Sequence, residues 1–258
     1  MKVVILCGGL GTRLREETEF KPKPMIEIGN KPILWHIMKT YSYYGVKDFV
    51  LCLGYKGESI KEYFCNYEVL NSDFTIELGK NKNIDIHGSH DEDGWRITFV
   101  DTGDRTLKGA RLKQVEKYID GDIFMATYGD GVSNVNIKAL LDFHKSHGKI
   151  ATVTGVNPTS LFGDLKISGE KVEVFREKSK SDRNFVSGGF FVFSRKIFDY
   201  LNRDEDCDLE MGPMEQIAKK GELMVYKHTD FWACMDTYRD VEYLNKLWKE
   251  NKATWKVW

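Results

Sequence analysis

Short apolar runs alternate with segments of helical period near the start of the chain, and this alternation constrains the fold more than any other feature. Mainly aliphatic residues fill 3–7 and 49–53, and apolar residues recur at helical spacing over 33–44 and 60–67. The two apolar runs are continuous, as expected for strands that helices cover on both faces. The pattern predicts an α/β fold with a Rossmann-like, mostly parallel sheet flanked by helices.

The second half of the chain predicts short strands with fewer helices between them. A helix is expected over 137–147, with Ser133 or Asn134 as its N-cap, and an amphipathic helix over 238–249. The strands expected in this half are 123–127, 150–156, 165–167, 172–175 and 190–193. We therefore expect one domain over 1–258, with an α/β part to about residue 155 and an appended β-rich lobe over about 156–258.

Charge and hydropathy exclude several classes of protein. The 38 Lys and Arg residues balance 39 Asp and Glu residues, for a net charge of −1 without a basic run, which disfavours a nucleic-acid partner. No apolar stretch approaches the roughly 20 residues of a membrane span, and the N-terminus does not resemble a signal peptide. We expect a cytoplasmic protein without a membrane partner.

The cysteines are odd in number, widely spaced and mostly set among apolar residues. They contain no CxxC pair, so we expect reduced thiols in the core rather than disulfides or a zinc site. The five are Cys7, Cys52, Cys65, Cys207 and Cys234.

A glycine-rich segment, GGLGTRL at residues 8–14, follows the first predicted strand directly. Glycine permits positive φ and lets backbone N–H groups approach an anion closely, so the segment predicts a phosphate-binding loop. A dinucleotide fingerprint would need glycine in place of Leu14, and a Walker loop would need a Gly-Lys-Ser/Thr that is absent.

Two lysines follow this loop within the segment KPKPM at residues 21–25, where prolines stiffen the backbone. Alone, such a segment is typical of a solvated turn. Beside the glycine loop and Arg13, it favours binding of a polyphosphate, because cations on a rigid loop complement its charge.

Two aspartates occupy positions where a catalytic ligand is expected. Asp130 follows a predicted buried strand, and Asp236 lies between an apolar run and a predicted helix. Either can be structural, Asp130 in an Asp-Gly turn and Asp236 as a helix cap.

The pair of motifs GGLGTRL and KPKPM resembles the signature of the sugar-1-phosphate nucleotidylyltransferases. The resemblance to those that join CTP to glucose 1-phosphate covers essentially all 258 residues. It runs through the segments CLGYKGESIKEYF, VDTGDRTLKGARLK, TYGDGV, GGFFVF and FWACMDTYRD. It implies a fold of the nucleotide-diphospho-sugar transferase type, with a nucleotide-binding first part and a sugar-binding β-rich second part.

The resemblance also implies a reaction. An oxygen of α-D-glucose 1-phosphate attacks the α-phosphorus of CTP in line, with Mg²⁺ as cofactor, and CDP-glucose and pyrophosphate are the products. It further implies a homo-oligomer such as a hexamer, with residues 79–95 and the aromatic end 255–258 as contact surfaces. The product would serve deoxysugar and O-antigen synthesis for lipopolysaccharide.

The resemblance also assigns roles to residues of this chain that match the family's motifs. Lys23 and Arg13 match the catalytic cations, which contact the reacting phosphates and neutralise the departing pyrophosphate. Glu177 and Lys178 match an EKP element that binds the sugar phosphate, although Ser179 replaces its proline. Arg111 is expected to donate to cytosine O2 and N3.

The full expected site has three parts. Residues expected to bind the nucleotide are Leu6, Gly8, Gly9, Gly11, Thr12, Arg13, Lys23, Thr102, Gly109, Arg111 and Asp130. Residues expected to bind the sugar phosphate are Gly163, Glu177, Lys178, Gly188 and Gly189, and the expected metal ligands are Asp130 and Asp236.

Two alternatives to this activity remain open at the level of sequence. The same chemistry can act on UTP, dTTP or another sugar phosphate, since a few hydrogen bonds select the base. A non-catalytic subunit that senses nucleotide sugars is the other alternative, because a fold does not guarantee activity.

Overall fold

A computed structural model describes residues 1–9, 11–79, 83–157, 164–168, 171–176 and 185–258. A seven-stranded sheet forms its centre, in the order β14-β10-β13-β8-β1-β4-β7. β13 is antiparallel to both of its neighbours and the other pairs are parallel, which confirms the mostly parallel sheet. The strands are β1 (Lys2–Leu6), β4 (Asp48–Leu53), β7 (Arg96–Asp101), β8 (Ile123–Tyr128), β10 (Ala151–Val156), β13 (Val186–Ser194) and β14 (Leu223–His228).

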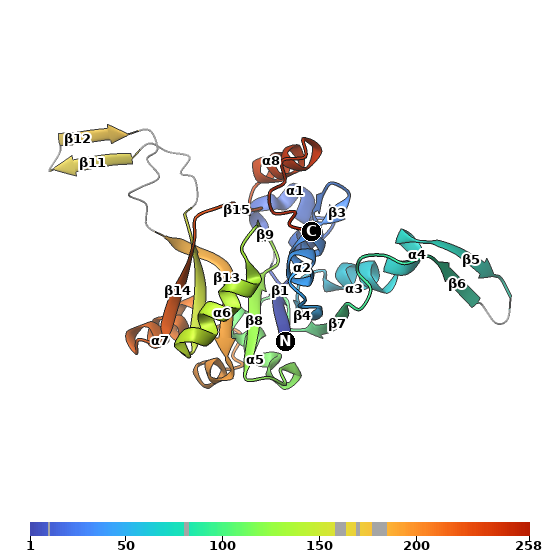
Figure 1. Ribbon diagram of the computed structural model, residues 1–258, viewed down its shortest axis with the longest axis horizontal. Coiled ribbons are helices and arrows are strands. Elements are labelled where there is room, and N and C mark those ends of the chain that lie inside the picture. Colours follow the sequence, from blue (N-terminus) through green and yellow to red (C-terminus); the bar gives the residue numbers. More distant parts are fainter. Residues whose placement is uncertain (10, 80–82, 158–163, 169–170, 177–184) are drawn as a thin grey trace.

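Helices cover both faces of this sheet (Figure 1). Alternate residues of β1 belong to two apolar clusters, one on each face of the sheet. Val3 and Ile5 pack in the cluster that contains residues of α2 and α6, and Val4 and Leu6 pack in the cluster that contains residues of α5 and α7. The α-helices are α1 (Arg15–Thr18), α2 (Ile33–Tyr43), α3 (Gly57–Cys65), α4 (Tyr67–Asn71), α5 (Lys108–Gln114), α6 (Ile137–His147), α7 (Glu215–Lys219) and α8 (Tyr238–Lys249). None of the helices in the described ranges has both the length and the apolar character to cross a membrane.

Smaller ladders and turns complete the chain. The paired strands are β2 (Glu27–Ile28) with β3 (Lys31–Pro32), β5 (Asp73–Glu77) with β6 (Asn83–His87), β9 (Gly131–Ser133) with β15 (Trp232–Cys234), and β11 (Asp164–Ser168) with β12 (Lys171–Arg176). The short helices are η1 (Thr12–Leu14), η2 (Lys23–Met25), η3 (Glu116–Tyr118), η4 (Arg195–Tyr200) and η5 (Glu210–Met214).

The central sheet continues past residue 155. We expected the later strands to lie in an appended lobe, but β13 inserts between β8 and β10, and β14 pairs with β10. The reason is burial, because Phe191 and Phe193 on one face of β13 and Phe190 on the other are each 2% exposed or less. The β11–β12 pair is separate from the central sheet.

The N-cap of α6 is neither of the expected residues. Asn136 caps the helix, and its side chain accepts a hydrogen bond from the Ala139 amide at 2.9 Å. Ser133 donates instead to the Phe231 carbonyl, and Asn134 donates to Asp230, both at 2.8 Å. Their side chains are thereby used to join β9 to the segment before β15.

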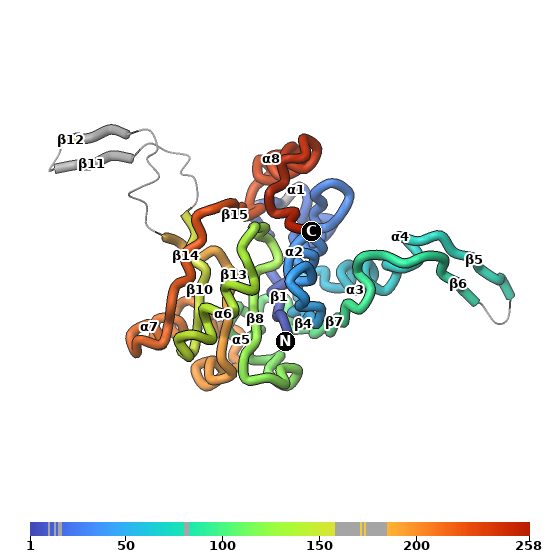
Figure 2. The backbone as a smooth tube through the Cα atoms, viewed as in Figure 1, coloured from blue at the N-terminus to red at the C-terminus, as the bar shows by residue number. Residues whose placement is uncertain are grey.

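One other expectation needs correction. All five cysteines, which lie within the described ranges, are free, but Cys65 is exposed rather than in the core. The aromatic end 255–258 stays a predicted oligomer contact, but its first residue, Trp255, is 0% exposed and packs inside the chain. Its ring stacks on Phe231 at a centroid distance of 5.4 Å, and the C-terminus lies beside α2 (Figure 2).

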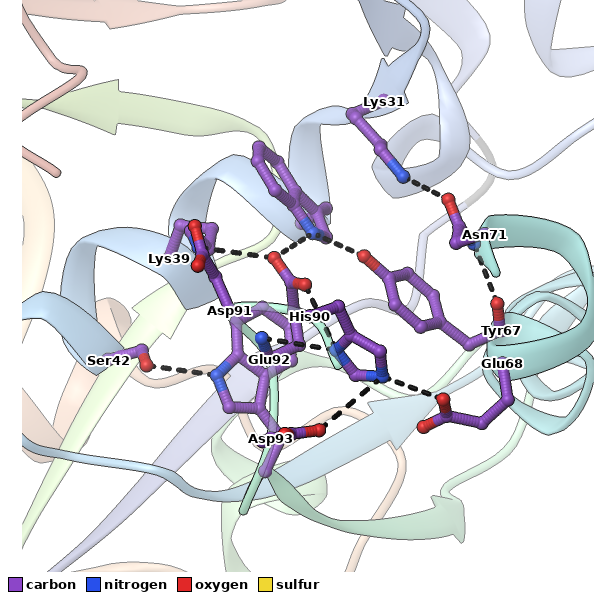
Figure 3. Close-up of polar contacts among 12 residues, drawn as sticks. Lys31, Lys39, Ser42, Tyr67, Glu68, Asn71, His90, Asp91, Glu92 and Asp93 are labelled. Atoms are coloured by element: carbon purple, nitrogen blue, oxygen red, sulfur yellow. Dashed lines mark hydrogen bonds and ion pairs between the residues drawn. The ribbon is translucent and has the colours of Figure 1, made fainter. Parts of the chain in front are cut away.

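The segment 79–95, expected above as an oligomer contact surface, includes β6 of the β5–β6 hairpin, which projects from the body (Figures 1 and 2). A buried polar cluster anchors its base to α2 (Figure 3). Glu92, 8% exposed, lies 3.2 Å from the Lys39 ammonium and accepts a hydrogen bond from the Trp35 indole at 3.1 Å. His90 adds contacts to Glu92 at 3.3 Å and to Glu68 of α4 at 2.7 Å. Charge pairing, rather than apolar packing alone, holds this segment on the core.

We predict that Glu92→Ala lowers the free energy of unfolding by about 3 kcal/mol, because it leaves the Lys39 ammonium buried without its closest carboxylate. Asp91→Ala is the matched control, since Asp91 lies 3.3 Å from the same ammonium but is 88% exposed. Asp91→Ala should lower the free energy of unfolding by less than about 1 kcal/mol. Urea unfolding measures both, and equal losses would contradict a structural role for the buried pair.

Candidate functional site

A cavity of about 470 Å³ opens at the carboxyl ends of β1 and β8. In open α/β sheets this edge is where ligands bind. Nine of the expected site residues line it: Leu6, Gly8, Gly9, Gly11, Thr12, Lys23, Asp130, Gly188 and Asp236. The structure thus brings together segments from the beginning, the middle and the end of the chain.

The glycine loop leaves β1 along one wall of this cavity. Gly9 and Gly11 have φ of 145° and 61°, values that side chains rarely adopt. A Cβ on Gly11 would lie 2.5 Å from Thr18, whose hydroxyl donates to the Gly11 carbonyl at 3.1 Å. The loop therefore needs glycine for both its backbone conformation and its close packing.

Gly8 packs against a buried cation. A Cβ at this position would lie 2.1 Å from the guanidinium carbon of Arg111, a residue that is 2% exposed. Arg111 donates to the Leu53 carbonyl at 3.0 Å and to the Thr102 hydroxyl at 2.7 Å, and thereby joins α5 to the ends of β4 and β7. Arg111 and Thr102 lie behind the loop rather than among the lining residues. The expected contact between Arg111 and cytosine stays a prediction.

Lys23 also lines this cavity. Its ammonium donates to Asp130 at 2.7 Å and to Asp236 at 2.5 Å. Burial opposes the charge of the ammonium, but the two carboxylates outweigh burial and raise the pKa of Lys23. Lys21, the other lysine of this segment, lies 3.4 Å from Glu27 in a more exposed position.

The local sequence explains how the two aspartates reach Lys23. Asp130 occupies the turn between β8 and β9, so the Asp-Gly turn and the contact with Lys23 coexist. Asp236 is not a helix cap, because Thr237 caps α8 in a capping box with Asp240. Asp236 instead lines the cavity, where its carboxylate accepts the hydrogen bond from Lys23.

Cys234, which sequence reasoning did not include in the site, lies beside these carboxylates. Its sulfur and one oxygen each of Asp130 and Asp236 lie within 4.8 Å of one another. Burial, followed by the charge of Asp130, raises the pKa of the Cys234 thiol. Cys234 lies two residues before Asp236 in the sequence. Because alternate residues of an extended segment share a face, this spacing could have identified Cys234 as a site residue.

Other cavity residues were also missed. Lys108, next to the expected Gly109, lies 2.5 Å from Glu210 and 5.4 Å from the centre of the Tyr128 ring. Trp232 donates from its indole to the Gly188 carbonyl at 2.8 Å, and so joins β15 to β13 across the cavity. Among the described residues that line the cavity, Lys23 and Lys108 supply the basic side chains.

Several residues expected in the site do not line the cavity, and others are not among the residues that the structure describes. Gly109 packs against the Asp208 carbonyl, which a Cβ would approach to 2.8 Å. Gly189 has φ of 76°, and a Cβ there would lie 2.6 Å from the Tyr128 ring. Gly163, Glu177, Lys178 and the side chain of Arg13 lie outside the described residues.

The donor set of the site fits a divalent cation. Two carboxylates approach one point from different segments, and both are partly open to the cavity, with exposed side-chain fractions of 26% for Asp130 and 36% for Asp236. Carboxylate oxygens with room for water and phosphate are the ligands that Mg²⁺ favours.

Comparisons with known proteins agree with this geometry. A family model described as nucleotidyl transferase matches residues 2–256. The glucose-1-phosphate cytidylyltransferases of Salmonella typhi and Salmonella typhimurium are each 51% identical to the chain over 259 residues, covering 100% of both partners.

Solved structures share the fold at low identity. UDP-glucose pyrophosphorylase complexed with UDP-glucose superposes with a TM-score of 0.69 at 14% identity, over 97% of this chain and 98% of that chain. HddC from Yersinia pseudotuberculosis superposes with a TM-score of 0.68 at 22% identity, over 96% of this chain and 99% of that chain.

We predict that Gly8→Ala destabilises the protein by about 2 kcal/mol, because the added methyl collides with the buried Arg111 guanidinium. In an Arg111→Ala background the same substitution should cost less, with a coupling on the order of 1 kcal/mol. Lys113→Ala, on the same helix but away from Gly8, is the control background and should leave the cost unchanged. Urea unfolding of the wild type, the two single variants and the double variant measures this coupling. If the losses of unfolding free energy from Gly8→Ala and Arg111→Ala simply add, the contact is refuted.

Proposed function

The chain belongs to the nucleotidyl transferase family, and on this basis we propose that it transfers the cytidylyl group of CTP to α-D-glucose 1-phosphate, giving CDP-glucose and pyrophosphate. The observation that carries the proposal is the full-length similarity to enzymes of that activity. The contact of Lys23 with two aspartates, in a cavity that the glycine loop also lines, supports it.

The reaction is an in-line substitution at phosphorus. A phosphate oxygen of glucose 1-phosphate forms a bond to the α-phosphorus of CTP, and the bond from that phosphorus to the β-phosphate bridge breaks, so pyrophosphate leaves. The chain contributes position and charge rather than a covalent intermediate. Backbone N–H groups of the glycine loop bind phosphate oxygens, and Lys23 neutralises charge at the reacting phosphates.

Enzymes of this family generally use a divalent metal ion, and we propose Mg²⁺ at Asp130 and Asp236. When bound, the ion withdraws charge from phosphate oxygens and so favours the transition state. CTP brings several negative charges to the site, and a divalent ion would help to neutralise them.

The remaining residue assignments follow from the same proposal. Glu177 and Lys178, with Gly163, Gly188 and Gly189, would bind the sugar phosphate. Arg111, with Thr102 and Gly109, would border the cytosine. Enzyme and substrates would meet in the cytoplasm, where the product would serve deoxysugar and O-antigen synthesis.

We also propose that the chain acts as a homo-oligomer, such as a hexamer. The β5–β6 hairpin presents the opposed apolar pairs Phe74/Ile86 and Ile76/Ile84, whose members are 36–39% exposed. A two-stranded hairpin is marginally stable alone, so a second copy covering this apolar face would stabilise it.

The experiment that tests the activity measures pyrophosphate release with glucose 1-phosphate and Mg²⁺. CTP, UTP, dTTP, ATP and GTP are compared in parallel, each with a control without sugar. We expect CTP to exceed the others by at least about 100-fold in kcat/KM, because a pocket with unpaired polar groups rejects the wrong base. Equal rates with UTP would refute the cytosine assignment. No release with any nucleotide would favour first a different sugar phosphate and then the sensing subunit.

We predict that Asp130→Asn and Asp236→Asn each lower kcat on the order of 100-fold, because each removes a carboxylate from the proposed ion. Asp142→Asn is the matched control, since Asp142 is an exposed residue of α6 that pairs with Lys138. Its rate should equal that of the wild type. A wild-type rate in either site variant, in folded protein, would remove that residue from the mechanism.

A further inference from the structure

The thiol of Cys234 faces the same point as the two aspartates. Pairing of β15 with β9 sets Cys234 opposite Gly131, the residue after Asp130. The next amide, of Met235, donates to the Asp130 carbonyl at 2.8 Å, while the Met235 side chain is 0% exposed. Because side chains of an extended segment alternate, Cys234 and Asp236 both face the cavity and Met235 faces the core.

These three groups form a mixed donor set. One sulfur and two carboxylate oxygens lie within 4.8 Å of one another, and all three residues line the cavity. Mg²⁺ has little affinity for sulfur, whereas Zn²⁺ and Co²⁺ bind thiolate, carboxylate and imidazole ligands. Three protein ligands with one position open to water are typical of a four-coordinate zinc site.

We propose that Cys234 makes this site selective for thiophilic divalent ions, so that Zn²⁺ displaces the catalytic ion and inhibits turnover. This inference rests on the proposed function for the inhibition, but not for the binding itself. A Zn²⁺ ion held by all three groups occupies the carboxylate oxygens that Mg²⁺ requires. It also competes with the Lys23 ammonium, which donates to both aspartates.

When the metal ion binds, it replaces the proton of the Cys234 thiol. The thiol of Cys234 gives its proton to solvent, its sulfur forms a bond to the metal, and no oxidation takes place. Lys23 keeps its proton and loses its hydrogen bonds to the carboxylate oxygens that the ion takes. Zn²⁺ therefore inhibits by occupying the carboxylate oxygens in place of Mg²⁺.

The first test titrates the full chain with Co²⁺ alone, which reports a metal–thiolate bond by its charge-transfer absorbance. We expect the band in the wild type, its loss in Cys234→Ser, and a weaker band in Asp130→Asn. Cys65→Ser is the matched control, because Cys65 is the exposed free cysteine and should not contribute. Absence of the band in the wild type, or its persistence in Cys234→Ser, would overturn the proposal.

The second test measures inhibition by Zn²⁺ of Mg²⁺-dependent pyrophosphate release, each variant relative to its own uninhibited rate. Loss of a metal ligand should raise the half-inhibiting Zn²⁺ concentration at least about tenfold in Cys234→Ser, while Cys65→Ser keeps the wild-type value. An unchanged value in Cys234→Ser would overturn the inhibitory role. Since the Co²⁺ band requires no turnover, it separates failure of this proposal from failure of the proposed function.

Discussion

The contact of one ammonium with two carboxylates determines how the site is assembled. Lys23 lies 107 residues from Asp130 and 213 residues from Asp236 along the chain. Two partly buried carboxylates that approach one point repel each other, and a cation between them offsets that repulsion. The ends of β8 and β15 can therefore meet at η2, and the cavity forms where they do.

The glycine loop depends on a second buried cation. Arg111 is held by oxygens of Leu53 and Thr102, and its guanidinium occupies the space that a side chain at position 8 would need. The loop is thus supported from behind by a group with a fixed position. A phosphate-binding loop benefits from such support, because backbone donors that are already ordered lose little entropy when an anion binds.

A third buried charge, outside the cavity, shows the same principle in a structural role. Glu92 and Lys39 are both less than 10% exposed, and the indole of Trp35 completes their contacts. A hairpin that projects from the body contributes few apolar contacts of its own. Its base is therefore anchored by directional contacts, which specify one orientation on α2.

The sequence by itself determined the local elements and the two motifs, GGLGTRL and KPKPM, that contribute residues to the cavity. The helices over 137–147 and 238–249 have the predicted bounds, because periodicity of 3.6 is a property of neighbouring residues. Only the tertiary structure decided that β13 enters the central sheet and that Cys234 joins Asp130 and Asp236. Strand order and side-chain clusters depend on pairing between distant segments, which burial and charge select after the local elements have formed.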